Sequence, residues 1–163
     1  MQFGVIDYHI QQCENHLDVT GSRNTEIELY FVQYLLIRIC AEFETRLSVL
    51  VERRCHRITD AHVKQFSGLS AKQACKRFNI GDIKGILARF GDDYKDTFDS
   101  LVCNTPAHAA WDNIYNNRVA VAHLTGTQMS FSDLKANYSN SLIVLDALVN
   151  TLGLNAHEIA DLT

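Results

Sequence analysis

Hydrophobic residues recur along most of the chain at spacings of three and four, which is the periodicity of one face of an α-helix. The first such stretch covers residues 3–17, with apolar positions at Ile6, Ile10, Cys13 and Leu17. A longer stretch follows Thr25 and runs to Arg54 without a Gly or Pro. Its apolar residues cover more than half of the helix circumference in the first part. We therefore expect a central helix about 40 Å long with neighbours on two sides.

Capping residues divide the rest of the chain into further helices. A Ser, Thr or Asp at the N-cap, or a Pro in the first turn, predicts a helix start. Such signals stand at Thr25 with Glu28, Asp60, Ser70 with Gln73, Asp82, Thr105–Pro106 and Ser130 with Asp133. Glycines predict the matching ends, at Gly21, Gly68, Gly91, Gly126 and Gly153. The sequence therefore predicts a single all-α domain over residues 1–163, a helical bundle of three to four long helices with short basic helices inserted.

Composition agrees with a globular domain, because 47% of the 163 residues are hydrophobic and 21% are charged. No apolar run approaches the length of a membrane span, and the N-terminus lacks the features of a signal peptide. The five cysteines include no C-x-x-C pair, which predicts neither a zinc ribbon nor a disulfide framework. We expect a cytoplasmic protein without membrane contact, whose cysteines are reduced and mostly buried.

Charge is distributed unevenly. Residues 53–89 hold nine basic and two acidic residues, a formal charge of +7, so the remainder carries −11 of the total of −4. A basic segment of this kind favours a polyanionic partner such as nucleic acid. We take Lys72, Lys76 and Arg77 as candidate ligands of the nucleic-acid backbone. The alternative is that these residues are ordinary solvated helix faces.

The helix that follows Pro106 carries the most distinctive chemistry. Trp111, Ile114, Tyr115, Val119, Val121 and Ala122 have the pattern of core residues. Arg118 offers a planar donor fork for phosphate, and His123 can donate or accept a proton at neutral pH. The two residues lie about 140° apart and about 7.5 Å along an ideal helix, so both could reach one phosphodiester. Such a pair suffices to cleave RNA through its own 2′-hydroxyl. The alternative is that Arg118 pairs with a helix acid and His123 contacts its helix C-terminus.

Other candidate sites are less specific. The remaining histidines show no metal-ligand spacing, so we predict no metal and no cofactor. The acidic stretch with Asp92, Asp93, Asp96 and Asp99 lacks the glycine and terminal glutamate of a calcium loop. Two short helices at 71–78 and 82–90 could form a DNA-binding helix-turn-helix, which is the main alternative from another class.

The arrangement of Arg118 and His123 at the end of one helix, followed by Leu124-Thr125-Gly126 and one more long helix, resembles the HEPN superfamily. The long helix with ICAEFETRL resembles the other core helix of that family, and GILARFGDDYKDTF resembles the linker region of its defence-associated ribonuclease branch. The resemblance covers a core of about residues 25–152. It implies a metal-independent endoribonuclease that acts as a homodimer through the 106–124 helix and leaves a 2′,3′-cyclic phosphate.

The resemblance also implies roles for individual residues. His123 would move protons, Arg118 would hold the scissile phosphate, and a glutamate of the long helix would face the arginine. We take Glu44 as that glutamate because its neighbours at spacings of three and four are mostly apolar or small. Asn117, next to the arginine, is a candidate substrate ligand. A nuclease of this kind implies control by an antitoxin or a larger defence complex. Val119 stands where the family often has a polar residue, which leaves an inactive binding or dimerisation module as an alternative.

Overall fold

The computed structural model describes residues 3–123 and 126–159, and these residues form eight α-helices and no strand. The all-α class predicted from the hydrophobic periodicity is therefore confirmed. In chain order the helices are α1 (Gly4–Thr20), α2 (Glu26–Cys55), α3 (Ala61–Ala74), α4 (Ile80–Ala88), α5 (Asp92–Val102), α6 (Ala107–Ala122), α7 (Phe131–Thr151) and α8 (Ala156–Ile159).

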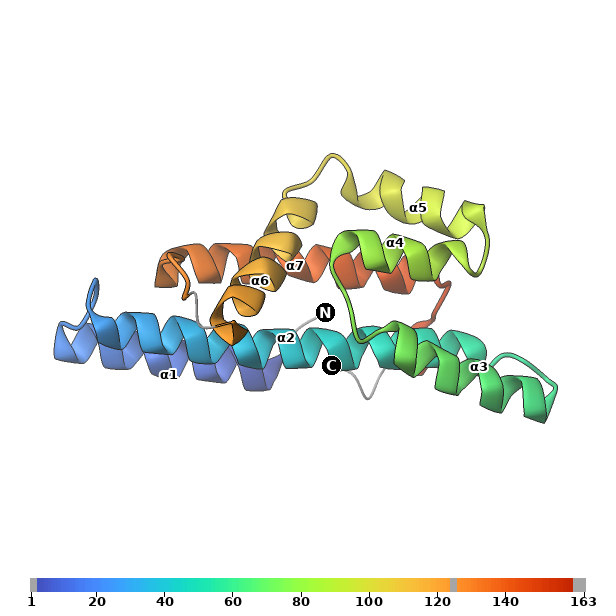
Figure 1. Cartoon of the computed structure of the whole chain (residues 1–163), viewed down its shortest axis with the longest axis horizontal. Helices are drawn as coiled ribbons and strands as arrows, with labels where there is room; N and C mark the ends of the chain where they lie inside the picture. Colours follow the sequence, from blue (N-terminus) through green and yellow to red (C-terminus); the bar gives the residue numbers. More distant parts are fainter. Residues whose placement is uncertain (1–2, 124–125, 160–163) are drawn as a thin grey trace.

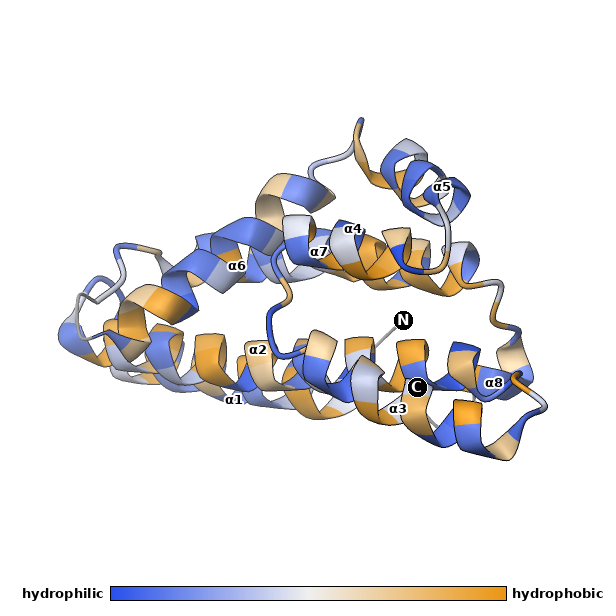
Figure 2. Cartoon of the chain, turned by 45° about the vertical axis from the view of Figure 1, so that its right-hand side comes forward, coloured by the Kyte–Doolittle hydropathy of each residue, from blue (hydrophilic) through white to orange (hydrophobic). Residues whose placement is uncertain are grey.

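Helix α2 is the long central helix that its hydrophobic pattern predicts. It contacts α1, α3, α6 and α7, and Figure 1 shows α1 running back along it while α6 crosses it obliquely. The residues that it buries lie at spacings of three and four, among them Val32, Leu35, Leu36, Ile39, Phe43 and Leu47. Apolar and polar residues alternate along each helix, so every long helix buries one face (Figure 2).

An aromatic cluster joins α2, α6 and α7. Phe43 stacks on Trp111 with ring centroids 4.4 Å apart, and the ring centroid of Tyr138 lies 6.4 Å from that of Phe43. The indole N–H of Trp111 donates to the backbone oxygen of Phe78 at 2.5 Å. The carboxylate of the next residue, Asp112, accepts from the backbone N–H of Ile80 at 2.9 Å. Helix α6 therefore fixes the place where α4 begins.

Several predicted helix ends are confirmed by their capping bonds. The Thr25 hydroxyl accepts from the N–H of Ile27 at 3.2 Å, and Ser130 forms a complete capping box with Asp133. Gly21 ends α1 in the left-handed conformation, with φ of 63°, which a glycine adopts without strain. The capping box expected at Thr25 is incomplete, because Glu28 accepts from the N–H groups of Asn24 and Phe131 instead.

The predicted break at Gly68 and the predicted helix start at Ser70 are wrong. Asp60 does cap a helix, since its carboxylate accepts from His62 and Val63, but that helix continues through both positions to Ala74. A glycine inside a helix costs only about 1 kcal/mol relative to alanine. Ala71, the buried residue of α3, lies about one helical turn after Gly68 and faces α2. The packing of α3 on α2 therefore extends the helix past the glycine.

The boundaries of the next two helices also differ from the prediction. Asn79, not Asp82, is the N-cap of α4, and its side chain accepts from the N–H of Asp82 at 2.8 Å. Asn and Asp are equally good N-caps, so the bond from Ile80 to Asp112 decides where α4 begins. Gly91 is the N-cap of α5, with φ of 148°, and the acidic stretch after it is a helix of 11 residues.

Candidate functional site

The C-terminal half of α6 is less buried than its apolar pattern predicts. Trp111 and Ile114 are buried, as expected. From Tyr115 to Val121 each side chain is half-buried or exposed, and Ala122 is exposed. Tyr115 and Val121 pack against the core while staying partly exposed, whereas the assignment of Val119 and Ala122 to the core is wrong within this single chain. This part of α6 presents a surface that is partly apolar and carries Arg118.

Arg118 and Glu44 both act electrostatically on one side chain, the buried Cys40. The thiol of Cys40 lies 3.9 Å from the backbone oxygen of Ile114, where α6 crosses α2. Burial raises the pKa of this thiol to about 12, while the positive charge of Arg118 lowers it and the negative charge of Glu44 raises it. Both charges therefore act on one thiol. Arg118 and Glu44 form no ion pair with each other in the part of the chain that the structure describes.

Glu44 lines an open cleft of about 480 Å³ between α2 and α3. The same cleft is lined by Lys72, so the structure brings two of the predicted site residues together. Lys72 also lies 3.7 Å from a carboxylate oxygen of Glu52, the second acidic residue of the cleft. The remaining lining residues are Ala41, Thr45, Ser48, Val49 and Cys75. The cleft is therefore mixed in charge, with polar and small side chains between the charged groups.

His123 is exposed and lies at the C-cap of α6, where its backbone N–H donates to the oxygen of Val119 at 3.0 Å. Because α6 ends at Ala122, His123 lies just outside the helix. The angle of about 140° between Arg118 and His123, which assumes an ideal helix, therefore does not hold. Leu124 and Thr125, which the sequence motif includes, lie outside the described residues. His123 does not line the cleft that holds Glu44.

Asn117 is bonded within the chain at both ends of its amide. Its Nδ2 donates to the backbone oxygen of Asn113 at 2.8 Å, and its Oδ1 accepts from the hydroxyl of Thr127 at 2.6 Å. The same hydroxyl accepts from the N–H of Met129 at 3.0 Å. The side chain thus ties the end of α6 to the approach to α7. No spacing in the sequence indicates this contact, because it joins two residues ten positions apart, one in α6 and one that follows it.

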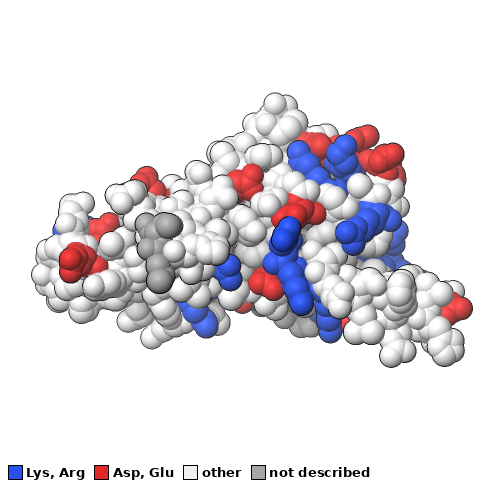
Figure 3. Space-filling view, viewed as in Figure 1, with Lys and Arg blue, Asp and Glu red and all other residues white. Residues whose placement is uncertain are grey.

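The basic segment is only partly free to meet a polyanion. Several of its members form ion pairs, among them Arg57 with Glu158, Lys72 with Glu52 and Lys84 with Asp99. Arg54 donates to the hydroxyl of Tyr94. Lys76 and Arg77 are exposed and form no hydrogen bond or ion pair with any residue described. In Figure 3 most of the visible Lys and Arg atoms gather over α4, α5 and the connection from α3 to α4, with acidic side chains among them.

The two helices considered for a helix-turn-helix do not pack as such a unit. Helix α3 packs on α2, whereas α4 packs on α5 and α6. The helices also begin and end elsewhere than predicted, since α3 covers Ala61–Ala74 and α4 covers Ile80–Ala88. The structure thus gives no recognition helix supported by a packed partner helix at this place.

No protein-family model, curated protein or solved structure matches this chain. Within residues 3–123 and 126–159, no helix is long and apolar enough to span a bilayer. Over the same residues, no group of three or more His, Cys, Asp or Glu side chains is placed to hold a metal ion.

Proposed function

We propose that this protein is an endoribonuclease of the HEPN type that cleaves RNA without a metal ion. His123 accepts the proton of the ribose 2′-hydroxyl, and the 2′-oxygen attacks the neighbouring phosphorus. The bond from phosphorus to the 5′-oxygen breaks, and that oxygen takes up a proton. The products carry a 2′,3′-cyclic phosphate and a free 5′-hydroxyl.

Arg118 binds the scissile phosphate and stabilises the charge that develops on it. The observation that carries the proposal is the position of Arg118, half-buried on α6, where its charge and that of Glu44 both act on the buried Cys40. A half-buried guanidinium has less water around it than one on an open surface, so its charge acts more strongly on a bound anion. Within the residues described, Glu44 forms no ion pair with Arg118, so its part in the proposal is the negative charge that it places near Cys40.

The cleft between α2 and α3 supports a path for the RNA backbone. It opens beside Glu44, and Lys72 lines it. Lys76 and Arg77 follow directly after α3 and are exposed. These three cations can contact successive phosphates, which gives affinity but no sequence preference. The two carboxylates in the cleft repel phosphate, so RNA would contact its basic side.

A homodimer through the 106–124 helix completes the proposal. The apolar residues Tyr115, Val119 and Val121 are only half-buried in one chain, which leaves apolar surface for a second copy. His123 is exposed at the end of the same helix and would meet Arg118 of the other copy across the two-fold axis. An antitoxin or a defence complex in the cytoplasm would control such an activity.

The decisive experiment compares wild-type protein with His123→Ala on total RNA in the presence of EDTA. We expect cleavage by the wild type, unaffected by EDTA, and a loss of about 100-fold or more in the variant. His108→Ala is the matched control, because this histidine lies on the same helix, away from Arg118, and should leave the rate unchanged. Full activity in His123→Ala would refute the mechanism.

Arg118→Ala should also abolish cleavage, with Arg38→Ala as its control, since Arg38 is exposed on α2. The alternative, an inactive binding or dimerisation module, is favoured by Val119 directly after the arginine. RNA binding by the wild type without cleavage under any condition would establish that alternative. Circular dichroism on each variant separates loss of chemistry from loss of fold.

A further inference from the structure

A second cleft, of about 330 Å³, opens between α2, α3 and the C-terminal end of α4. It shares no lining residue with the cleft that holds Glu44. Helix α3 contributes to both, with Phe66, Ser70 and Ala74 lining this one and Lys72 lining the other. The cleft is thus a separate feature of the fold, and its argument does not depend on the proposed ribonuclease activity.

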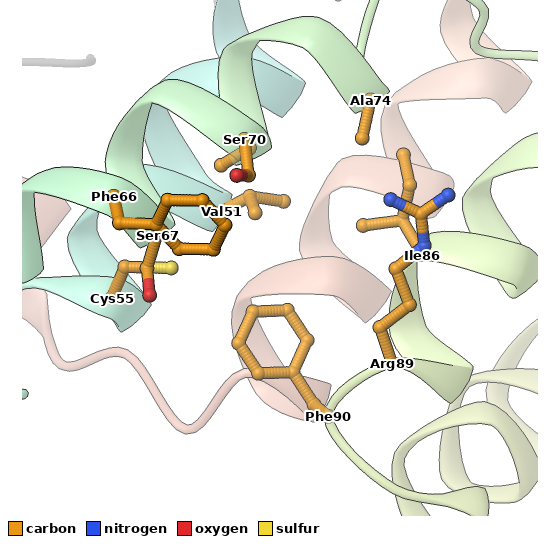
Figure 4. Close-up of a pocket in the computed structure, with 10 residues that line it drawn as sticks. Val51, Cys55, Phe66, Ser67, Ser70, Ala74, Ile86, Arg89 and Phe90 are labelled. Atoms are coloured by element: carbon orange, nitrogen blue, oxygen red, sulfur yellow. The ribbon is translucent and has the colours of Figure 1, made fainter. Parts of the chain in front are cut away.

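The body of this cleft is apolar. Figure 4 shows the ring of Phe66 flanked by Val51 and Cys55 of α2, with the ring of Phe90 on the other side of the cleft. Burial raises the pKa of the Cys55 thiol, so this side chain is neutral at physiological pH. Phe66 remains 73% exposed, which is unusual for an aromatic side chain and leaves its ring available to a ligand.

Three polar groups border the apolar body, and none of them is satisfied by the protein. Arg89 carries the formal charge of the cleft, since no other Lys, Arg, Asp or Glu lines it. Its guanidinium forms no ion pair or hydrogen bond with any described residue. The hydroxyls of Ser67 and Ser70 likewise form none within the described part of the chain. In Figure 4 the Arg89 side chain extends along the α4 side of the cleft, toward Ala74.

We propose that this cleft binds a small amphipathic carboxylate. The hydrocarbon body, of about eight to ten carbons, lies between Phe66 and Phe90, and the carboxylate pairs with Arg89. The volume lies at the lower end of the range for small-molecule sites, which sets this size. Covering the two rings supplies the apolar driving force, and the arginine fork matches a carboxylate. One cation in an apolar cleft fits a single negative charge better than a doubly charged phosphate.

Octanoate and 1-octanol are the probes that test both parts of this proposal. Each is titrated into the isotope-labelled protein and followed by nuclear magnetic resonance of the backbone amides. We expect saturable binding of octanoate with shifts at Phe66, Ser70 and Phe90. Arg89→Gln should weaken octanoate about tenfold and leave 1-octanol unchanged, because it removes only the charge-assisted bond. Arg77→Gln is the matched control, an exposed arginine outside the cleft, and should bind octanoate as the wild type does.

Ser70→Leu places an apolar side chain in the cleft and should abolish binding of both probes. Ser70 is exposed, so the fold should tolerate this change, and Ala74→Leu gives a second blocking variant. Non-saturable shifts spread over the whole chain would overturn the site. Octanoate binding that is equal in Arg89→Gln and the wild type would overturn the role of the arginine, and binding that survives in both blocking variants would overturn the location.

Discussion

The carboxylate of Glu28, in the first turn of α2, accepts a hydrogen bond of 2.9 Å from the backbone N–H of Phe131, the first residue of α7. Its other oxygen accepts from the N–H of Asn24 at 2.7 Å. The first N–H groups of a helix have no acceptor within that helix. Glu28 therefore supplies one for α7 and ties together the starts of the two longest described helices.

Removing this tie should destabilise the fold. Glu28 is buried, so Glu28→Ala leaves two N–H groups without their acceptor, and we expect a loss of roughly 1–3 kcal/mol in the free energy of unfolding. Urea denaturation followed by circular dichroism measures it. Glu26→Ala is the control, because Glu26 is exposed in the same helical turn. Equal unfolding midpoints for the two variants would contradict this role of Glu28.

The same carboxylate should make stability depend on pH. The N–H groups of Asn24 and Phe131 lower the pKa of Glu28 below its ordinary value of 4.5. The ionised form is thus favoured in the folded state, and its contribution is present above pH 4.5 and lost as the pH falls through the lower folded pKa. The difference in stability between wild type and Glu28→Ala should shrink below that pH. A difference that stays constant from pH 7 to 3 would rule out this linkage.

Cysteine reactivity provides a test of the packing between α2 and α6. Burial raises the pKa of Cys40 and of Cys75 to about 12, so both thiols stay protonated at pH 8, whereas Cys103 is exposed. The thiolate is the reactive form. Iodoacetamide should therefore label Cys103 first in the native protein and all five cysteines in urea, as read by mass spectrometry of peptides. Labelling of Cys40 as fast as Cys103 would show that α6 does not cover it.

RNA binding should depend on the exposed cations after α3. Replacing Lys72, Lys76 and Arg77 together by Glu should weaken binding and flatten its dependence on salt, since fewer counterions are then released. Fluorescence anisotropy at several salt concentrations measures the slope. Arg38→Glu is a control, because Arg38 is exposed near the middle of α2 and lies outside the basic segment. A slope that matches the wild type would identify the three cations as bystanders.

Mixing two inactive variants tests the composite site. If each site takes Arg118 from one copy and His123 from the other, a heterodimer of Arg118→Ala with His123→Ala has one intact site. Random pairing makes half of the dimers heterodimers, so the mixture should recover about a quarter of wild-type activity. Sedimentation at micromolar concentration checks that the dimer forms. No recovery from a mixed dimer, or cleavage by a monomer, would place the site within one chain.

Interactions between residues close in the sequence determine the all-α class and several of the helix boundaries of this protein. The hydrophobic spacing predicted α1 and α2, and the caps at Thr25, Asp60 and Ser130 predicted three helix starts. A capping bond joins residues two or three apart in the chain, so its donor and acceptor are both visible in the sequence. The all-α class follows from the same short-range signals.

Contacts between segments that are distant in the sequence decide the remaining helix boundaries and the surroundings of the candidate site. Gly68 lies inside α3 because Ala71 packs on α2, and α4 begins before Asp82 because Asp112 accepts from Ile80. The proximity of Arg118 and Glu44 to one thiol depends on where α6 crosses α2, 74 residues away along the chain at Cys40 and Ile114. A propensity or a cap describes a few neighbouring residues, whereas a cleft or a crossing depends on how whole helices bury their apolar faces together. Only the tertiary structure supplies that information.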